Sequence, residues 1–506
     1  MERQRWTFGL VGLGVLVLLI ALASRGGNAP EAATTTLQDV ASPDVSTSTI
    51  TSTTVSTLTN EPDDAFVTIT PAVDVAAVVA AQPEGTRFVF EPGVYRHVSI
   101  SPRSDQVFEA QEGVVFSGSK ILTDFTFDGD RWFVDGQTQQ EWDHGECFAS
   151  NPRCRHPEDL FVDGELQTHV SSLQAVGPGS WFFDYNADRI YLGSDPDGSV
   201  VETSVTRHAF SSDADRVEIR GFVIQRYANQ AQHGVIDSRL DNRTDSDRGD
   251  GWIVESNVIR QNHGTGIVVT DHGVVRNNEI IENGQLGITA YGLDVEVTEN
   301  VIAGNNTTGF DYGWEGGGSK FKRTTGLVVE GNVVRDNFGP GLWTDIDNVD
   351  STIEDNVVQN NAYIGIFHEI SYSAVIRDNI VEGNGFHYTV DVWGAGITVA
   401  ASPDVEVTGN IVRGNAGGIV AIQQNRADAP ASYGPVEIEN LRVYDNVVEM
   451  NDGFTGLRQE VGDDSYYKSR NNVFEANEFV VDGQQDRFYW NNRPIGLAEW
   501  LNLGLS

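Results

Sequence analysis

The stretch "NVIRQNHGTGIVV" at 257–269 joins a short Val/Ile-rich segment, a polar turn with Asn and Gly, and a second short apolar segment. The compact copies of this pattern begin 21, 22, 24 and 23 residues apart, and larger gaps follow Asn300, Asn379 and Asn410. We interpret these gaps as loops inserted into a regular coil. The further copies are "NEIIENGQLGITA" (278–290), "NVIAGNNTTGFDY" (300–312), "NVVRDNFGPGLWT" (332–344), "NVVQNNAYIGIFH" (356–368), "NIVEGNG" (379–385), "NIVRGNAGGIVAI" (410–422), "NVVEMNDGF" (446–454) and "NVFEAN" (472–477).

Such a unit cannot bury its own apolar face, but stacked units can, so the repeat predicts an all-β, right-handed parallel β-helix, a single-stranded solenoid. We expect the repeated Asn side chains to form ladders at the turns. The glycine nine residues after each Asn is expected to form a tight corner, and the apolar residue after it to stack inside. These pairs are Gly266 and Ile267, Gly287 and Ile288, Gly309 and Phe310, Gly341 and Leu342, and Gly365 and Ile366.

The rest of the chain divides by composition. Basic residues, an apolar run at 6–23 and "ALA" at 21–23 predict a signal peptide or signal anchor over 1–27, so the protein is expected outside the cytoplasm, secreted or anchored to the membrane. A Thr/Ser-rich stretch at 28–62 is typical of a disordered linker. We interpret 63–120 as an N-terminal cap with the first coils, 121–205 as an inserted β-rich subdomain, 206–484 as the β-helix repeats and 485–506 as a C-terminal cap.

The net charge of -40 and the presence of only four lysines exclude nucleic acid as a partner, because little positive charge could neutralise phosphates. They argue more weakly against strongly polyanionic glycans. The two cysteines, Cys147 and Cys154, could form a disulfide in an exported protein or remain thiols in a reducing compartment. We expect a monomer.

The register of the repeat brings two acids together. Asp345 lies four residues after Gly341, and Glu369 lies four residues after Gly365, so the two should occupy equivalent positions on successive coils. Adjacent strands lie about 4.8 Å apart, and retaining glycosidases need two carboxyl groups about 5 Å apart. Repulsion between close carboxylates raises one pKa, which suits a nucleophile beside a proton donor. We therefore expect Asp345 and Glu369 to form a catalytic pair.

Substrate-binding candidates surround this pair. Trp343 and Phe367 should share the outward face with the two acids, although they could instead pack beneath loops. Asp311 is expected one coil before Trp343, and the glycine-rich loop that follows Asp311 should lie over the same face. Asp347 is either a solvated turn acid or a sugar-binding acid, and His368 should point inward. The candidates are Trp343, Phe367, Asp311, Trp314, Glu315, Lys320, Asp347 and Trp393.

The stretch "GLWTDIDNVDSTIEDNVVQNNAYIGIFHEISYSAVIRDNIV" (341–381) resembles the pectin-lyase-like superfamily of right-handed β-helix proteins. It looks like the catalytic coils of retaining glycosidases of the β-xylosidase type, in which a W-x-D strand carries the nucleophile and the next coil a Glu acid/base. The resemblance implies Asp345 as nucleophile and Glu369 as proton donor, and the second acid of "WTDID" leaves Asp347 as an alternative.

Three functions remain open. The first is an extracytoplasmic retaining glycoside hydrolase that acts on a polysaccharide or oligosaccharide of little charge and needs no cofactor or metal. The second is a polysaccharide lyase or uronate C5-epimerase, with Lys320 or Lys322 as base and Ca²⁺ held by Asp311, Glu315 and Asp345. The third is a non-catalytic surface module that binds glycan or protein, which would not require a convergent acid pair.

Overall fold

The computed structural model describes residues 65–240, 248–387, 392–450, 453–481 and 486–506. The predicted export segment at 1–27 and the linker at 28–62 lie outside these residues. Within the described ranges, none of the helices has the length and apolar character needed to cross a bilayer.

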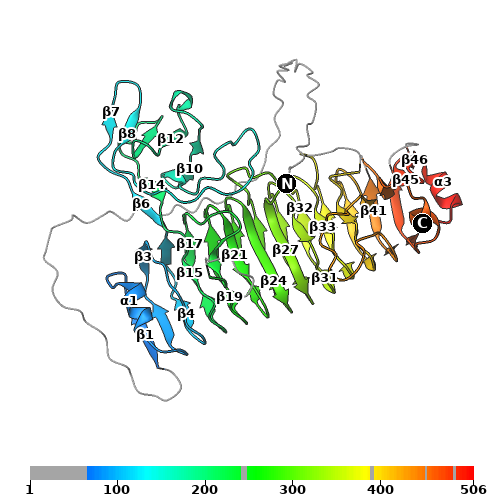
Figure 1. Cartoon of the computed structure of the whole chain (residues 1–506), viewed down its shortest axis with the longest axis horizontal. Helices are drawn as coiled ribbons and strands as arrows, with labels where there is room; N and C mark the ends of the chain where they lie inside the picture. The colour runs from blue at the N-terminus through cyan, green and yellow to red at the C-terminus, as the bar shows by residue number, and fades with distance from the viewer. Residues whose placement is uncertain (1–64, 241–247, 388–391, 451–452, 482–485) are drawn as a thin grey trace, which may run out of the picture. The chain divides into compact units, whose positions relative to one another are not determined.

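Three parallel sheets run through the described residues and form a β-helix, because each coil contributes one strand to each sheet (Figure 1). Sheet A contains β1 (Phe66–Ile69), β2 (Arg87–Phe90), β4 (Val107–Ala110), β16 (Glu218–Arg220), β19 (Ile253–Glu255), β22 (Val274–Arg276), β25 (Glu296–Thr298), β28 (Val328–Glu330), β31 (Ser351–Glu354), β34 (Ala374–Arg377), β37 (Val405–Thr408), β40 (Arg442–Tyr444) and β43 (Val473–Glu475). Sheet B contains β3 (Gly93–Arg96), β5 (Val114–Ser117), β17 (Val223–Gln225), β20 (Val258–Arg260), β23 (Glu279–Ile281), β26 (Val301–Ala303), β29 (Val333–Arg335), β32 (Val357–Gln359), β35 (Ile380–Glu382), β38 (Ile411–Arg413), β41 (Val447–Met450) and β44 (Glu478–Val481).

Sheet C carries the candidate site. It contains β15 (Phe210–Ser211), β18 (Gly234–Asp237), β21 (Thr265–Val269), β24 (Leu286–Leu293), β27 (Gly317–Thr325), β30 (Leu342–Asp345), β33 (Ile366–Glu369), β36 (Ile397–Ala400), β39 (Ile419–Gln423), β42 (Thr455–Gln459), β45 (Phe488–Trp490) and β46 (Arg493–Ile495). Alternate residues of each strand point into the coil, and the resulting core of stacked Val, Ile, Leu and Phe is continuous.

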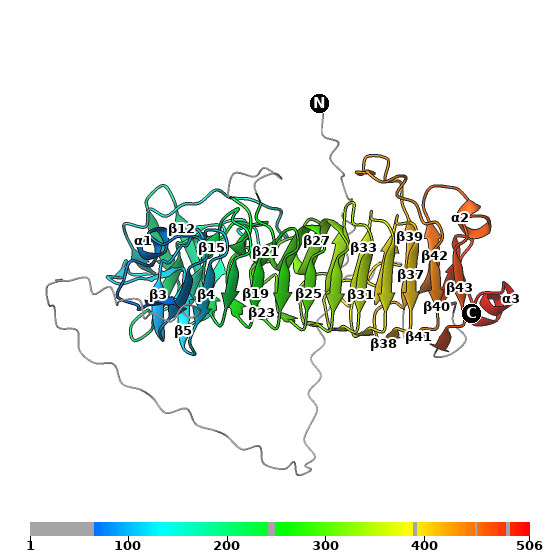
Figure 2. The same ribbon diagram turned by 90° about the horizontal axis from the view of Figure 1, so that it is seen from below.

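Helices cover both ends of this core. Val75 and Val79 of α1 (Val75–Ala80) are buried in it at the start. At the other end, Trp500 of α3 (Leu497–Asn502) packs against Phe474 and Phe488, with ring centroids 5.3 and 4.8 Å apart. Figure 2 places α3 beside the last labelled strand of sheet A, β43, and the short helix α2 (Ser465–Lys468) lies near the same end.

Buried asparagines fix the register from coil to coil. At the corner before sheet B, each Asn side-chain amide donates to the amide oxygen of the next Asn, as in Asn332 to Asn356 at 3.0 Å. The ladder confirms the predicted role of the repeated Asn residues from Asn257 to Asn446. It ends on Asn477, not on the predicted Asn472, because Asn446 donates to Asn477 at 2.9 Å. Asn472 instead precedes β43 in sheet A.

A second ladder, which the sequence reading missed, runs through the corner before sheet C. Its members lie five residues after those of the first, and Asn337 donates to Asn361 at 2.9 Å. The residue before each ladder Asn has a positive φ, for example Ser256 at 57° and Asp336 at 56°. The tight corners therefore lie just before the asparagines. The second ladder comprises Asn262, Asn283, Asn305, Asn337, Asn361, Asn384 and Asn415.

The prediction that the repeated glycines form the corners is wrong. A glycine recurs at the position of Gly341 because a side chain has no room there. A Cβ would lie 2.7 Å from the Gly365 carbonyl oxygen and 2.9 Å from the Asn361 side-chain amide. Gly309 and Phe310 are not members of this series, because Gly317 of β27 pairs with Leu286 and so Gly318 occupies the equivalent position. The sequence pattern is misleading at Gly309 because the inserted loop before β27 carries its own Gly-Phe pair.

Two further sheets, drawn from residues 119–204, form the inserted part. The first contains β6 (Ser119–Ile121), β9 (Leu160–Val162), β10 (Glu165–Leu166) and β14 (Val201–Ser204). The second contains β7 (Thr126–Phe127), β8 (Trp132–Val134), β11 (Thr168–His169), β12 (Ser180–Asp184) and β13 (Arg189–Leu192), and the short 3-10 helix η1 (Leu173–Ala175) follows β11.

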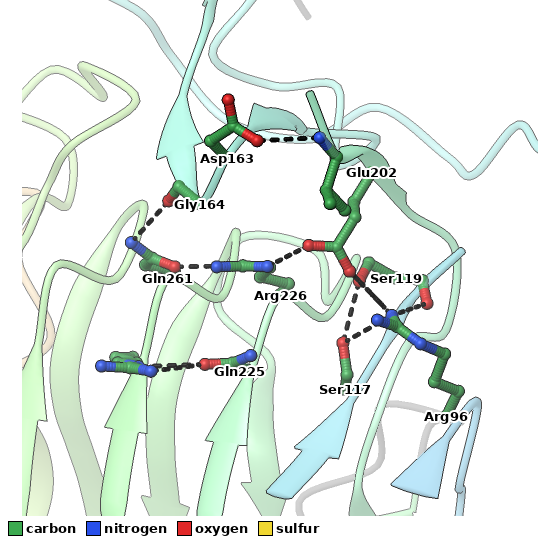
Figure 3. Close-up of polar contacts among 11 residues, drawn as sticks. Arg96, Ser117, Ser119, Asp163, Gly164, Glu202, Gln225, Arg226 and Gln261 are labelled. Atoms are coloured by element: carbon green, nitrogen blue, oxygen red, sulfur yellow. Dashed lines mark hydrogen bonds and ion pairs between the residues drawn. The ribbon is translucent and has the colours of Figure 1, made fainter. Parts of the chain in front are cut away.

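A buried carboxylate fastens these sheets to the coils (Figure 3). Glu202 of β14 accepts hydrogen bonds from Arg96 of the first coils at 2.7 Å and from Arg226, which follows β17. Gln261 extends the contact, donating to the Gly164 carbonyl at 3.2 Å. Burial raises the pKa of Glu202, but the arginines outweigh it and the pKa is lowered, so this carboxylate is ionised in place.

Cys147 and Cys154 form a disulfide in the loop between β8 and β9. Cys147 also makes an antiparallel bridge with Phe310, and the Phe310 ring packs with Cys154 in a small buried cluster. The inserted part therefore contacts the loop that leads into β27, next to the strands of the acid pair.

Replacement of Asn337 by Ala should destabilise the protein by about 2–4 kcal/mol, because the substitution removes two donated bonds and leaves the buried Asn305 amide without its acceptor. Asn186→Ala, at an exposed hairpin turn, is the matched control and should change the free energy of unfolding by less than about 0.5 kcal/mol. Chemical denaturation measures both, and equal effects of the two substitutions would contradict the role assigned to the ladder.

Candidate active site

The acid pair has the predicted register. Asp345 at the end of β30 is the direct partner of Glu369 at the end of β33. Leu342 and Ile366 of the same strands lie in the central core, so the alternation places both carboxylates on the outer side of sheet C. The positions that follow on the next two coils are Ala400 and Ile422.

The two carboxylates are nearly buried and have different partners. Asp345 is 6% exposed and Glu369 is 7% exposed. One oxygen of Asp345 accepts from Lys320 at 2.9 Å, whereas its other oxygen, Oδ1, has no hydrogen-bond partner among the described residues. Glu369 is paired with Arg426 from a loop that follows β39. Lys320 comes from strand β27 and Arg426 from an inserted loop, so the two acids are paired with cations from different parts of the chain.

The surroundings of Glu369 change its pKa. Burial, followed by the neighbouring Asp345 carboxylate, raises the pKa of Glu369 to about 7, although Arg426 and Lys320 act in the opposite direction. Both causes favour the neutral form of Glu369. Close to neutral pH, Glu369 therefore exchanges a proton readily beside a carboxylate that is bound to a lysine.

Lysines occupy the strand before Asp345, and this overturns the predicted place of Asp311. Phe321 pairs with Thr344, so Lys320 and Lys322 lie on either side of that pair, next to Trp343 and Asp345. Lys320 also lies over the Trp343 ring, 3.7 Å from its centroid. The predicted register of Asp311 is wrong because it relies on Gly309, whereas Gly318 occupies the repeated glycine position.

Glu315 belongs to this lysine cluster. Its carboxylate accepts from Lys322 at 2.7 Å and lies 3.4 Å from Lys320. Burial raises its pKa, but the two lysines outweigh burial and the pKa is lowered, so Glu315 is an anion that holds the lysines in position.

Asp311 and Trp314 serve the loop and not the acid pair. The Asp311 carboxylate accepts from the Gly313 amide at 2.8 Å within its own turn. The Trp314 ring packs against Phe310 and against His144 of the inserted part, with centroids 6.0 and 5.4 Å away. The predicted register of Asp311 is therefore wrong, whereas substrate contact by Asp311 or Trp314 stays a prediction.

Three aromatic residues pack together next to the acids. Trp343 and Phe367 stack with centroids 5.5 Å apart, and Trp393 meets Phe367 edge-on at 6.2 Å. Trp343 is only 4% exposed and Phe367 only 3%, so the aromatics form a wall of the site with little free surface. His368, as predicted, points inward, where Thr344 and the Tyr372 carbonyl contact its two ring nitrogens and burial lowers its pKa to about 4.

Asp347 anchors a loop. It is 5% exposed, so the alternative of a solvated turn acid is wrong. Its carboxylate accepts from the Ser432 hydroxyl at 2.7 Å and from the Ser432 amide at 3.2 Å. These bonds hold residues 424–437, the segment that also delivers Arg426 to Glu369. Sequence reasoning did not assign Arg426 to the acid.

The metal ligands suggested for the lyase alternative do not converge, since Asp311 faces its own turn while Glu315 and Asp345 are bound by lysines. Within the ranges described above, no group of three or more His, Cys, Asp or Glu residues is arranged to hold a metal ion.

The model of the right-handed β-helix region matches residues 244–395, and no curated protein matches the chain. The structure of XylC in complex with xylose has a TM-score of 0.55 at 15% identity and covers 84% of this chain and 81% of that one. The A-module of the mannuronan C-5 epimerase AlgE6 of Azotobacter vinelandii has a TM-score of 0.45 at 13% identity, with 83% of this chain and 92% of that chain covered. Strand topology, family model and the XylC likeness agree, and the chain has the right-handed parallel β-helix fold.

Proposed function

We propose that the protein is an extracytoplasmic carbohydrate-active enzyme, a retaining glycoside hydrolase acting on a neutral or weakly charged glycan. The observation that carries this proposal is the direct pairing of Asp345 with Glu369 on adjacent strands. The strand spacing of about 4.8 Å matches the separation of about 5 Å at which one carboxylate attacks and the other moves protons.

The surroundings of the two carboxylates support a different catalytic role for each. Glu369, with its pKa near 7, can carry the proton that the leaving-group oxygen needs. Asp345, held by Lys320 through one oxygen, is the carboxylate that we propose attacks the anomeric carbon. After the glycosyl-enzyme bond forms, ionised Glu369 takes a proton from water, and this water cleaves the bond and restores Asp345.

Lys320 and the aromatic wall support these roles. Lys320 orients the Asp345 carboxylate, since its ammonium group contacts one oxygen of that carboxylate and lies over the Trp343 ring. The shared fold with a protein solved in complex with xylose makes pentose oligosaccharides the first substrates to test.

The lyase or epimerase alternative gains one observation, since Lys320 and Lys322 both lie beside the acids. A lyase base must lose its proton readily, however. Burial lowers the pKa of Lys322, but Tyr291 and Glu315 outweigh it and the pKa is raised, so Lys322 is a poor base. A non-catalytic binding module would not need the acid pair, and we therefore favour hydrolysis.

Asp345→Ala and Glu369→Gln should each lower kcat/KM on a pentose or hexose disaccharide by at least about 100-fold. Azide should rescue Asp345→Ala and yield a glycosyl azide of inverted configuration, because it replaces the nucleophile. Glu330→Gln, at an exposed carboxylate on sheet A, is the control and should retain full activity. Wild-type rates for either acid variant would contradict the assignment, and an unsaturated product would favour the lyase alternative.

The rate should fall as the pH rises through about 7, because the proton on Glu369 is then lost. Arg426 lowers the pKa of Glu369, so Arg426→Met should move this alkaline limb of the kcat/KM profile to higher pH. Arg413→Met, at an exposed arginine that pairs with Glu382, is the matched control and should leave the limb in place. A limb that does not move in Arg426→Met would show that another group sets it.

A further inference from the structure

A cavity of about 480 Å³ lies on the Glu369 side of the acid pair, beneath residues 424–437. Arg426 is part of its lining, together with Gln424, Ala427, Glu437, Asp463 and Arg470. We infer that this cavity binds the neutral sugar unit on the leaving-group side of the scissile bond. The inference rests on the hydrolase function proposed above and specifies the substrate as an oligosaccharide, in which a second sugar forms part of the recognised unit.

Arg426 connects the cavity to the chemistry. Its guanidinium bonds Glu369, the proposed proton donor, and also the Gln424 side chain at 2.6 Å. Glu369 aligns with Ala400 and then with Ile422, the neighbour of the lining residue Gln423. Because Arg426 both lines the cavity and bonds Glu369, one side chain separates the cavity from the proton donor, on the side of the later coils.

On the side of the preceding coil, largely buried charged side chains occupy the outer face of the sheet. On that side of Asp345, Lys320 and Lys322 are 4% and 13% exposed in their side chains, and Glu315 lies between them. Because a proton donor must face the leaving group, the open side next to Glu369 is the side on which the departing sugar would lie.

The charged residues of the lining are two arginines and two carboxylates, Arg426, Arg470, Glu437 and Asp463, so their formal charges sum to zero. Arg470 pairs with Glu437 and lies 3.5 Å from Asp463 and 3.7 Å from Glu439, while Arg426 is paired with Glu369. A ligand with a net charge would therefore meet no unpaired opposite charge, whereas hydroxyl groups can share the existing donors and acceptors.

The roof of the cavity is held in place before any ligand binds. Ser432 donates to Asp347 at 2.7 Å, and the Tyr372 hydroxyl donates to the Gly434 carbonyl at 2.7 Å. Val436 packs with Ile370 and Tyr372 in a small buried cluster. Such a preformed site avoids much of the entropy cost of ordering a loop around the substrate.

The test compares Ala427→Trp, which fills the cavity from an exposed position, with Asp428→Trp, which adds the same side chain to the same loop at a residue outside the lining. Each variant and the wild type would be assayed on disaccharides of xylose, glucose and mannose and on the glycosyl fluorides of the same sugars. A fluoride leaving group needs no sugar-sized space, so it reports on the acid pair alone.

We expect Ala427→Trp to lose at least about tenfold in kcat/KM on the disaccharide and to retain wild-type kcat/KM on the fluoride, while Asp428→Trp retains both. Equal disaccharide rates for Ala427→Trp and the wild type would overturn the assignment of the cavity and leave the hydrolase function standing. Turnover of neither substrate class by the wild type would instead overturn the hydrolase function and the inference with it. Loss of both activities in Ala427→Trp alone would place the tryptophan's effect at the acids and count against a separate sugar site.

Discussion

The amide-to-amide hydrogen bond between asparagines on successive coils is the interaction on which the rest of this structure depends. Each ladder Asn is buried, donates to the next side chain and accepts from the one before it, as Asn337 does between Asn305 and Asn361. A slip of one residue would leave several buried amides without partners, at a cost of about 1–3 kcal/mol each. Register is thereby fixed at every coil, and with it the pairing of Asp345 and Glu369, which no direct bond between the two acids could stabilise.

Placing two carboxylates side by side in a nearly buried site has an energetic cost, and the protein offsets it with separate cations. Lys320 binds Asp345, and Arg426 binds Glu369. Even with Arg426 and Lys320 nearby, the pKa of Glu369 is raised to about 7. Under the proposed hydrolysis, this raised pKa suits Glu369 to the role of proton donor.

The regular part of the fold could be predicted from the sequence, and the irregular part could not. Spacing alone identified the β-helix, the first asparagine ladder and the partner of Asp345, because period and side-chain alternation translate directly into position. The same spacing failed at Gly309, where an insertion imitates the repeat, and this misplaced Asp311. Arg426 could not be assigned to Glu369, since the path of an inserted loop depends on anchors such as Asp347 and Ser432 that share no period.

Insertions therefore supply what a uniform solenoid lacks. Repetition gives each coil the same outward surface, and chemistry requires that a few coils differ. Here the loop before β27 brings Glu315, and β27 itself carries Lys320 and Lys322, half of the four lysines in a chain of net charge -40. In so acidic a protein, positive charge gathered at two carboxylates is not explained by a need for solubility, which the acids already meet. Lys320 contacts Asp345, and Asp345 is the direct neighbour of Glu369 in sheet C, so this lysine contributes to positioning the pair.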